Sequence, residues 1–263
     1  METQGASAGA GLESPTTPRR ATRKTLWAIQ DNGGEAQPLI FVLAGYGDAW
    51  VAQNLARALG PEHNVYGVQP PGEAAALTAR DLAALYVKHL QVVQAHGPYW
   101  LGGYSAGAVM ALEMAIQLRA QGERVGLVAL FDPLFIRYTR FEHYCYLALQ
   151  RVCRVVETIL PVKLRVLQIL AAMFQDQGLD THLKALAGYK PAPYPGDIVF
   201  YHARWSVGRS PLLVRQWKWF TRARLKVETV PGDHHTFIRP PHLTELARRV
   251  RRDLERAGAS CSP

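Results

Sequence analysis

The chain of 263 residues contains only three cysteines, Cys145, Cys153 and Cys261. So small and odd a number gives no disulfide framework, and it indicates a reducing compartment. The first 24 residues lack the apolar core of a signal peptide, because small and turn-forming residues predominate there. The longest uncharged run, residues 90–112, includes glutamine, histidine and a Gly-Pro pair, which do not suit the ~20 apolar residues of a membrane span. We therefore expect a soluble, cytoplasmic protein without a membrane partner.

Acidic residues are scarce as well, since 21 Asp and Glu face 30 Lys and Arg, and the net charge is +9 at pH 7. A basic surface attracts an acidic partner, whether nucleic acid, a membrane face or a protein, and charge alone does not choose among them. No recognised nucleic-acid-binding motif is present, so we expect no nucleic-acid partner. The scarcity is greatest in residues 202–226, which hold seven basic residues and no acidic one.

What the chain does have is a composition of 48% hydrophobic and 10% aromatic residues, enough to bury a sizeable core. Disordered and collagen-like classes are thereby excluded. Residues 1–24 offer no apolar face, so we predict a flexible tail there and one folded domain over residues 25–263.

Short apolar runs alternate with helix-length segments over most of this domain. Such alternation predicts an α/β protein with a parallel sheet and helices on both faces, because parallel strands need crossover helices. One helix has a capping-box spacing at its start, with Thr78 three residues before Asp81. The alternation breaks for about 60 residues after Asp132, where segments of helical length predict a helical insertion. The expected strands cover 39–43, 65–68, 99–101, 125–131, 198–201 and 225–230, and the expected helices cover 50–59, 78–93, 106–121, 144–160, 163–174 and 243–254.

The segment Gly103-Tyr104-Ser105-Ala106-Gly107 has the G-x-S-x-G form and lies between an expected strand and an expected helix. Such a strand-turn-helix elbow lifts a serine hydroxyl above the sheet edge, so Ser105 is predicted to be a nucleophile. A plain glycine turn that packs a helix on a sheet would have the same letters. A phosphopantetheine attachment serine is disfavoured because it belongs to a short helical domain, and a dinucleotide-binding turn because the G-x-G-x-x-G spacing is absent.

A serine nucleophile needs a base to accept its proton and an acid to orient that base, in the chain order serine, acid, histidine. Asp132 directly follows an expected strand, whereas Asp197 precedes its strand and so lies at the opposite sheet edge. His234 and His235 both follow the last expected strand, and either can be the base. A turn aspartate and a solvated loop histidine are the competing structural interpretations.

An oxyanion hole needs two preorganised N–H donors. Ala106 is one candidate, because its backbone N–H would lie at the start of the helix that follows Ser105. The second donor is expected from the loop after the first core strand, with Ala44 and Gly45 as candidates, since glycine permits close backbone approach. The glycines of this loop can equally be turn residues.

Five segments share a running pattern with one known family: PLIFV at 38–42, LARALGP at 55–61, VYGVQPPG at 65–72, GPYWLGGYSAG at 97–107 and VPGDH at 230–234. On these segments the sequence resembles the thioesterase domains of non-ribosomal peptide and polyketide synthases. The resemblance implies the α/β-hydrolase fold, with a mostly parallel central sheet flanked by helices and a helical lid at about residues 134–186 after the sixth strand. It also implies Ser105 as the nucleophile, Asp132 as the acid and His234 as the base.

The same resemblance implies an enzyme that releases acyl, peptidyl or polyketide chains from the phosphopantetheine of an acyl or peptidyl carrier protein. An acyl-serine intermediate would end in hydrolysis or cyclisation, with no bound cofactor and no metal. Carrier proteins of this kind are acidic, so the basic residues of 202–226 and of the lid are expected to face the carrier. The alternatives are a serine esterase or lipase of the same fold and a non-catalytic basic interaction module.

Overall fold

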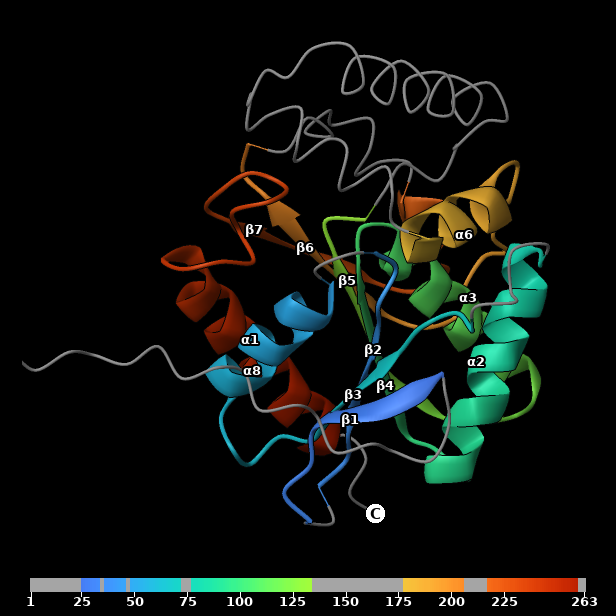
Figure 1. The fold of residues 1–263 in the computed structure, drawn as a ribbon, viewed down its shortest axis with the longest axis horizontal. Coiled ribbons are helices and arrows are strands. Elements are labelled where there is room, and N and C mark those ends of the chain that lie inside the picture. The colour runs from blue at the N-terminus through green and yellow to red at the C-terminus, as the bar shows by residue number, and fades with distance from the viewer. Residues whose placement is uncertain are drawn as a thin grey trace, which may run out of the picture.

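The computed structural model describes residues 25–33, 36–45, 48–71, 77–133, 177–205 and 217–259, with the backbone alone for residues 177–180. Its central element is a seven-stranded sheet in the order β1-β3-β2-β4-β5-β6-β7. Neighbouring strands are parallel except for β1 and β3, which pair antiparallel at one edge (Figure 1). The strands are β1 (Leu26–Gln30), β2 (Leu39–Val42), β3 (Val65–Val68), β4 (Tyr99–Tyr104), β5 (Val125–Phe131), β6 (Ile198–Ala203) and β7 (Leu225–Val230).

Helices cover both faces of this sheet (Figure 1). On one face α1 packs against α8, and on the other α2 and α6 pack against α3. A buried hydrophobic cluster lies on each face, so the sheet separates the core into two halves. The predicted α/β class, with a mostly parallel sheet flanked by helices, is confirmed. The helices are α1 (Asp48–Leu59), α2 (Ala79–Val93), α3 (Ala106–Ala120), α6 (Gln177–Leu186) and α8 (His242–Ala259).

The central strands form continuous apolar runs because helices cover both of their faces. Every residue of β2, β4 and β6 is buried. Helix α3 is buried over most of its length, since it lies between the sheet and the helices α2 and α6. This central position places the N-terminus of α3, and with it Ser105, at the carboxyl edge of the sheet.

The start of α2 has the capping box that the sequence predicts. The Thr78 hydroxyl oxygen accepts a hydrogen bond from the Asp81 amide at 3.3 Å, and the Asp81 carboxylate accepts one from the Thr78 amide at 3.4 Å. These contacts satisfy two backbone donors that the first turn of a helix leaves without an internal partner.

The predicted insertion is described only at its end. Helix α6 falls within the predicted 134–186 lid, and its Leu183 and Leu186 are buried in the cluster shared with α2 and α3. The predicted helices 144–160 and 163–174, like the predicted tail 1–24, lie outside the described residues. Strand β1 was not among the expected strands. In the described part of the chain, no helix combines the length and apolarity that crossing a membrane requires.

Candidate active site

Four neighbouring strands end at one edge of the sheet and bring polar side chains together there. Ser105 follows β4, Asp132 follows β5, His202 lies near the end of β6 and His234 follows β7. Backbone hydrogen bonds extend the parallel pairing past the strand ends, with the Ser105 amide donating to Phe131 at 3.0 Å and the Asp132 amide to Tyr201 at 2.8 Å. Residues that are far apart in the sequence are thus held side by side at the carboxyl edge of the sheet.

Ser105 lies in a tight turn whose backbone is unusual for a residue with a side chain, with φ 55° and ψ −119°. The two glycines of the motif are required by close backbone approaches. A Cβ on Gly103 would lie 2.3 Å from the Gly107 carbonyl oxygen, and a Cβ on Gly107 would lie 2.5 Å from the Val42 carbonyl oxygen. The G-x-S-x-G pattern therefore has a steric origin here, because α3 starts directly against β2 and β4.

Ser105, His234 and Asp132 form a continuous row of hydrogen bonds. His234 Nε2 is 3.2 Å from Ser105 Oγ, and His234 Nδ1 is 2.6 Å from Asp132 Oδ2. Asp132 is buried, at 3% exposure. Its carboxylate therefore accepts a hydrogen bond from the imidazole rather than from solvent. With the proton on Nδ1, the Nε2 lone pair is free to accept the Ser105 hydroxyl.

His234 is held by its loop and by Tyr104. The Tyr104 hydroxyl donates to the His234 carbonyl oxygen at 2.7 Å, and the two rings stack with centroids 4.8 Å apart. Burial raises the pKa of Tyr104 well above its ordinary value, which keeps the hydroxyl a neutral donor. The Asp233 carboxylate accepts the amides of His235 at 2.8 Å and Thr236 at 3.0 Å, which closes the turn around His234.

The two histidines that the sequence left as alternatives occupy different places. His235 contacts the His234 ring edge-on, with centroids 5.2 Å apart, whereas His234 reaches Ser105. Burial lowers the pKa of His235, and the neighbouring His234 lowers it further. The geometry thus brings together Ser105, Asp132 and His234, while their catalytic roles stay a prediction.

The predicted oxyanion donors differ in their surroundings. Ala106 opens α3, so its N–H belongs to the first turn, where no earlier helical carbonyl accepts it. The amides of Ala44 and Gly45 instead donate to Asp48 Oδ2, at 2.8 Å and 3.0 Å. Asp48 is the first residue of α1 and is buried at 6% exposure. Both predicted loop donors are therefore already bound to a carboxylate, and their role toward an oxyanion stays a prediction.

His202 and Asp48 are site residues that the sequence interpretation missed. His202 Nδ1 is 3.0 Å from Asp132 Oδ1, on the opposite side of the carboxylate from His234. The sequence alone carries no register that would identify His202. The structure supplies it, since Phe131 pairs with Tyr201 and the next residues on the two strands are Asp132 and His202. Asp48 has a weak signal, as the first acidic residue after the glycine-containing loop.

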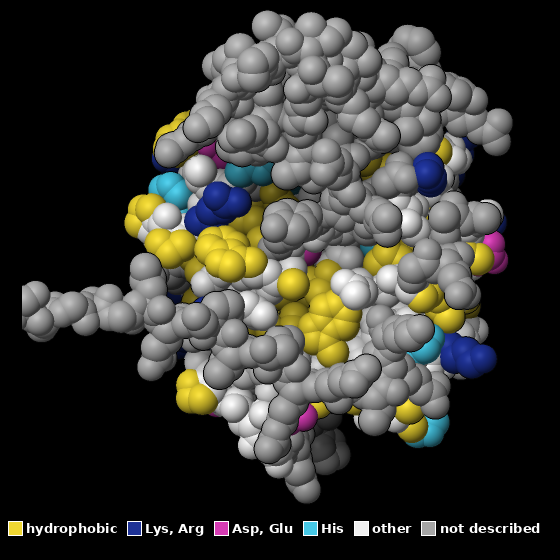
Figure 2. Space-filling view, viewed as in Figure 1, with side chains coloured by type: hydrophobic (Ala, Val, Ile, Leu, Met, Phe, Trp, Pro, Cys, Tyr) yellow, Lys and Arg dark blue, Asp and Glu magenta, His cyan; other side chains and the backbone are white. Residues whose placement is uncertain are grey.

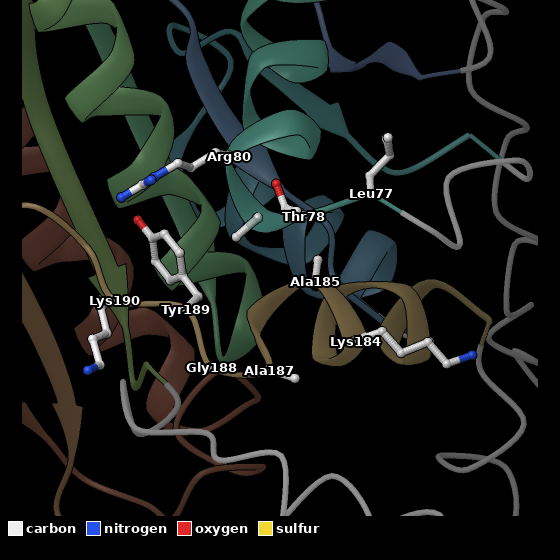
Figure 3. A pocket seen from close by; sticks show the side chains of 10 residues that line it. Leu77, Thr78, Arg80, Lys184, Ala185, Ala187, Gly188, Tyr189 and Lys190 are labelled. Atoms are coloured by element: carbon white, nitrogen blue, oxygen red, sulfur yellow. The ribbon is translucent and has the colours of Figure 1, made fainter.

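Two hollows in the described surface lie away from this site. One of about 610 Å³ lies between the start of α2 and the end of α6 (Figure 3). There Lys184 and Lys190 point away from each other, while Arg80 and Tyr189 point toward each other. The Tyr189 hydroxyl donates to Glu113. The other hollow, of about 500 Å³, lies at the amino ends of β5, β6 and β7.

Metal-ligating side chains do not gather in the described ranges, where no group of three or more His, Cys, Asp or Glu residues is placed to hold an ion. The polar groups at the carboxyl edge are arranged so that His234 can accept the Ser105 proton while Asp132 orients the imidazole. Such an arrangement activates a serine hydroxyl for attack on a carbonyl group.

Comparison with known proteins shows which family and fold the chain shares. The sequence pattern of the "Thioesterase domain" family matches residues 37–254. Malpibaldin synthetase from Mortierella alpina is 25% identical over 247 residues, which covers 85% of this chain and 4% of that protein. A dimodular nonribosomal peptide synthase from Bacillus subtilis is 33% identical over 139 residues, covering 48% of this chain and 6% of that protein. The chain thus spans less than a tenth of the length of either relative.

Solved structures share the fold. The NocB thioesterase domain, in a covalent complex with a fluorophosphonate nocardicin G analogue, superposes with a TM-score of 0.64 at 24% identity. The match covers 87% of this chain and 99% of that one. The α/β-hydrolase arrangement of sheet and helices is therefore shared over most of the chain.

Proposed function

The chain belongs to the thioesterase domain family, and on that premise we propose that it is a serine hydrolase acting on thioesters. Its proposed substrate is an acyl, peptidyl or polyketide chain carried on the phosphopantetheine of a carrier protein. The observation that carries the proposal is the hydrogen-bonded row from Ser105 Oγ through His234 to Asp132, with distances of 3.2 Å and 2.6 Å.

In the first half-reaction, the Ser105 hydroxyl transfers its proton to His234 Nε2 while Oγ attacks the thioester carbonyl carbon. A C–O bond forms and the carbonyl oxygen becomes an oxyanion, for which the Ala106 N–H at the start of α3 is a suitable donor. The C–S bond then breaks, and the leaving sulfur takes the proton from His234. The acyl group remains as an ester on Ser105.

In the second half-reaction, water or a nucleophilic group of the acyl chain gives its proton to His234 and attacks the ester carbonyl. The C–O bond to Ser105 breaks, and the proton on His234 returns to the serine oxygen. Asp132 stabilises the imidazolium in both halves. Attack by water gives a free acid, and internal attack gives a cyclic product.

A carrier protein or synthase is the proposed partner. Support comes from the relatives, which are synthetases of much greater length than the matched region. A thioester on a flexible arm also suits a nucleophile that stands at the carboxyl edge of the sheet. No cofactor enters the proposed steps, since the attacking group, the base and the oxyanion donor all belong to this chain.

The test is intact-mass analysis of wild type and Ser105→Ala after incubation with an acyl-pantetheine thioester. Wild type should release thiol and carry a transient acyl adduct, and Ser105→Ala should do neither because its nucleophile is absent. The mass of the freed product separates hydrolysis from cyclisation. A fluorophosphonate should modify wild type alone, by one adduct per chain.

A matched oxygen ester serves as the substrate control, because a thioesterase should process it more slowly while an esterase should prefer it. Circular dichroism checks that the variant is folded. Equal thiol release by wild type and Ser105→Ala would refute the proposal, and the non-catalytic interaction module would then be the better interpretation.

A further inference from the structure

We infer that His202 is a positioning residue, which orients the Asp132 carboxylate and through it His234. The inference rests on the proposed function, because orientation of Asp132 matters only if His234 acts as the base. His202 Nδ1 lies 3.0 Å from Asp132 Oδ1, while His234 Nδ1 lies 2.6 Å from Oδ2. One carboxylate is thus shared by two imidazoles, one on each oxygen.

The environment of His202 is that of a built contact rather than a surface encounter. His202 is 5% exposed and is the second-last residue of β6. The ring centroids of His202 and Phe200 are 5.4 Å apart. A buried imidazole needs a polar partner, because an unsatisfied polar group in the interior is costly. Asp132, at 3% exposure, supplies that partner.

Asp132 in turn needs a fixed orientation. Its backbone has φ 40°, so the residue leaves the end of β5 in a conformation that side-chain-bearing residues rarely adopt. Two donors reach Oδ1, the His202 imidazole at 3.0 Å and the Ala203 amide at 3.2 Å. Together they prevent rotation of the carboxylate and leave Oδ2 aimed at His234. Removal of the imidazole would take away the shorter of these two hydrogen bonds to Oδ1.

His202 acts through Asp132 and not on the substrate. His202 forms a hydrogen bond with Asp132, whereas His234 forms the one with Ser105 Oγ. The expected consequence of losing His202 is a fall in kcat at unchanged KM. Loss of a residue that binds the substrate equally in the ground state and the transition state would instead raise KM.

The experiment compares two amides of similar polarity. In His202→Asn the amide nitrogen takes the place of Nδ1 and keeps the donor to Asp132, whereas in His202→Gln it takes the place of Nε2 and does not. We expect kcat for thiol release to stay within about 3-fold of wild type in the asparagine variant and to fall about 10- to 100-fold in the glutamine variant, as expected for loss of one hydrogen bond to a charged group.

A second readout does not depend on turnover. The proton between His234 Nδ1 and Asp132 should give a low-field resonance in the proton NMR spectrum, present in wild type and His202→Asn and lost or shifted in His202→Gln. Urea unfolding of all three proteins identifies any variant that has merely lost stability.

Equal kcat and equal low-field resonances in the two variants would overturn the inference, as would equal losses in both, which would indicate a purely structural histidine. Failure of the proposed function is distinguishable, because then Ser105→Ala would still release thiol. The resonance comparison would report on Asp132 orientation even in that case.

Discussion

At the residue scale, Gly107 shows how little room the turn around Ser105 leaves. We expect Gly107→Ala to lower the free energy of unfolding by about 1–3 kcal/mol, because its Cβ would press on the Val42 carbonyl oxygen at 2.5 Å. Urea denaturation measures the change. The contact is with backbone, so relief would require a shift of α3 against β2.

Gly258 in α8 is the matched control, since an added Cβ would meet only the Trp100 ring, at 3.7 Å. Gly258→Ala should be neutral or stabilising by up to about 1 kcal/mol, as expected for alanine in place of glycine in a helix. Similar destabilisation in both variants would contradict the steric explanation of the motif.

The site residues divide by the kind of information that reveals them. The candidates Ser105 and Asp132 follow from their places after recognisable strands and from their chain order, which left His234 and His235 as alternatives. The family resemblance then favoured His234. His202 lies inside an apolar strand, and its role depends on register with β5, which single-sequence patterns do not carry. The involvement of Asp48 with the amides of Ala44 and Gly45 likewise depends on how the loop folds back on α1.

At the element scale, the start of α2 depends on Thr78. Thr78→Ala should lower the free energy of unfolding by about 1 kcal/mol, because the Asp81 amide loses its side-chain acceptor. Thr78→Ser keeps a hydroxyl at the same position and should change stability by much less. Thermal and urea unfolding of the pair measure the cap, and equal losses in both variants would contradict its role.

Helix α8 carries an acid-sensitive ion cluster at its start. Hydrogen bonds from Arg248 and then Arg249 lower the pKa of Glu245 from 4.5 to about 2. Because the pKa of Glu245 is lower in the folded state, its ion pairs with the two arginines stabilise the protein fully above pH 4.5. This contribution is lost as the pH falls toward 2. Because Glu245 is solvent-accessible, the contribution should stay below about 1 kcal/mol.

The measurement is urea unfolding of wild type and Glu245→Gln between about pH 6 and pH 3. Wild type should be the more stable at the upper end, and the difference should shrink as the pH falls. Subtracting the two removes other titrating carboxylates. A difference that stays constant or grows toward low pH would contradict the assignment.

The elements themselves were largely predictable, because strands buried on both faces read as unbroken apolar runs and because caps mark helix starts. The strand at 125–131, VGLVALF, has the predicted bounds and is an example of such a run. The strand at 225–230 also has the predicted bounds, although it includes two charged residues and only its last residue is buried. The strand β1 was missed since its residues, LWAIQ, are mostly half-buried and pair antiparallel at the sheet edge, where neither a hairpin turn nor a crossover helix signals a strand.

At the scale of the whole molecule, part of the positive charge on the described residues is neutralised by ion pairs. In residues 202–226, Arg224 pairs with Asp197 at 3.1 Å and Lys226 with Asp253 at 2.6 Å. Lys218 and Arg222 are exposed. On the face seen in Figure 2, hydrophobic side chains gather near the centre, while lysine and arginine side chains occur at separate places around them. The proposed docking of an acidic carrier would therefore use a subset of the basic residues.

We predict that Lys218→Glu/Arg222→Glu lowers turnover of a carrier-bound acyl group about 10-fold at low salt, with no effect on a small neutral thioester. Raising the salt concentration should narrow the gap, because screening weakens steering. The control is Arg57→Glu/Lys88→Glu, which makes the same charge change on the exposed surfaces of α1 and α2. Equal losses in the two double variants would show that net charge, rather than this surface, governs turnover.

The spread of the site over four strands also determines when it is completed during synthesis. Ser105 and His234 are 129 residues apart, and Asp132 and His234 are 102 residues apart. A nascent chain that has emerged only through β6 can place Ser105, Asp132 and His202 on paired strands, but it lacks His234 and leaves the β6 edge open until β7 arrives. On the proposed mechanism, in which His234 is the base, we expect reactivity of the serine to be a late event of folding. A reagent that reacts only with the activated hydroxyl would time the docking of β7 and its loop, and not the earlier assembly of the central strands.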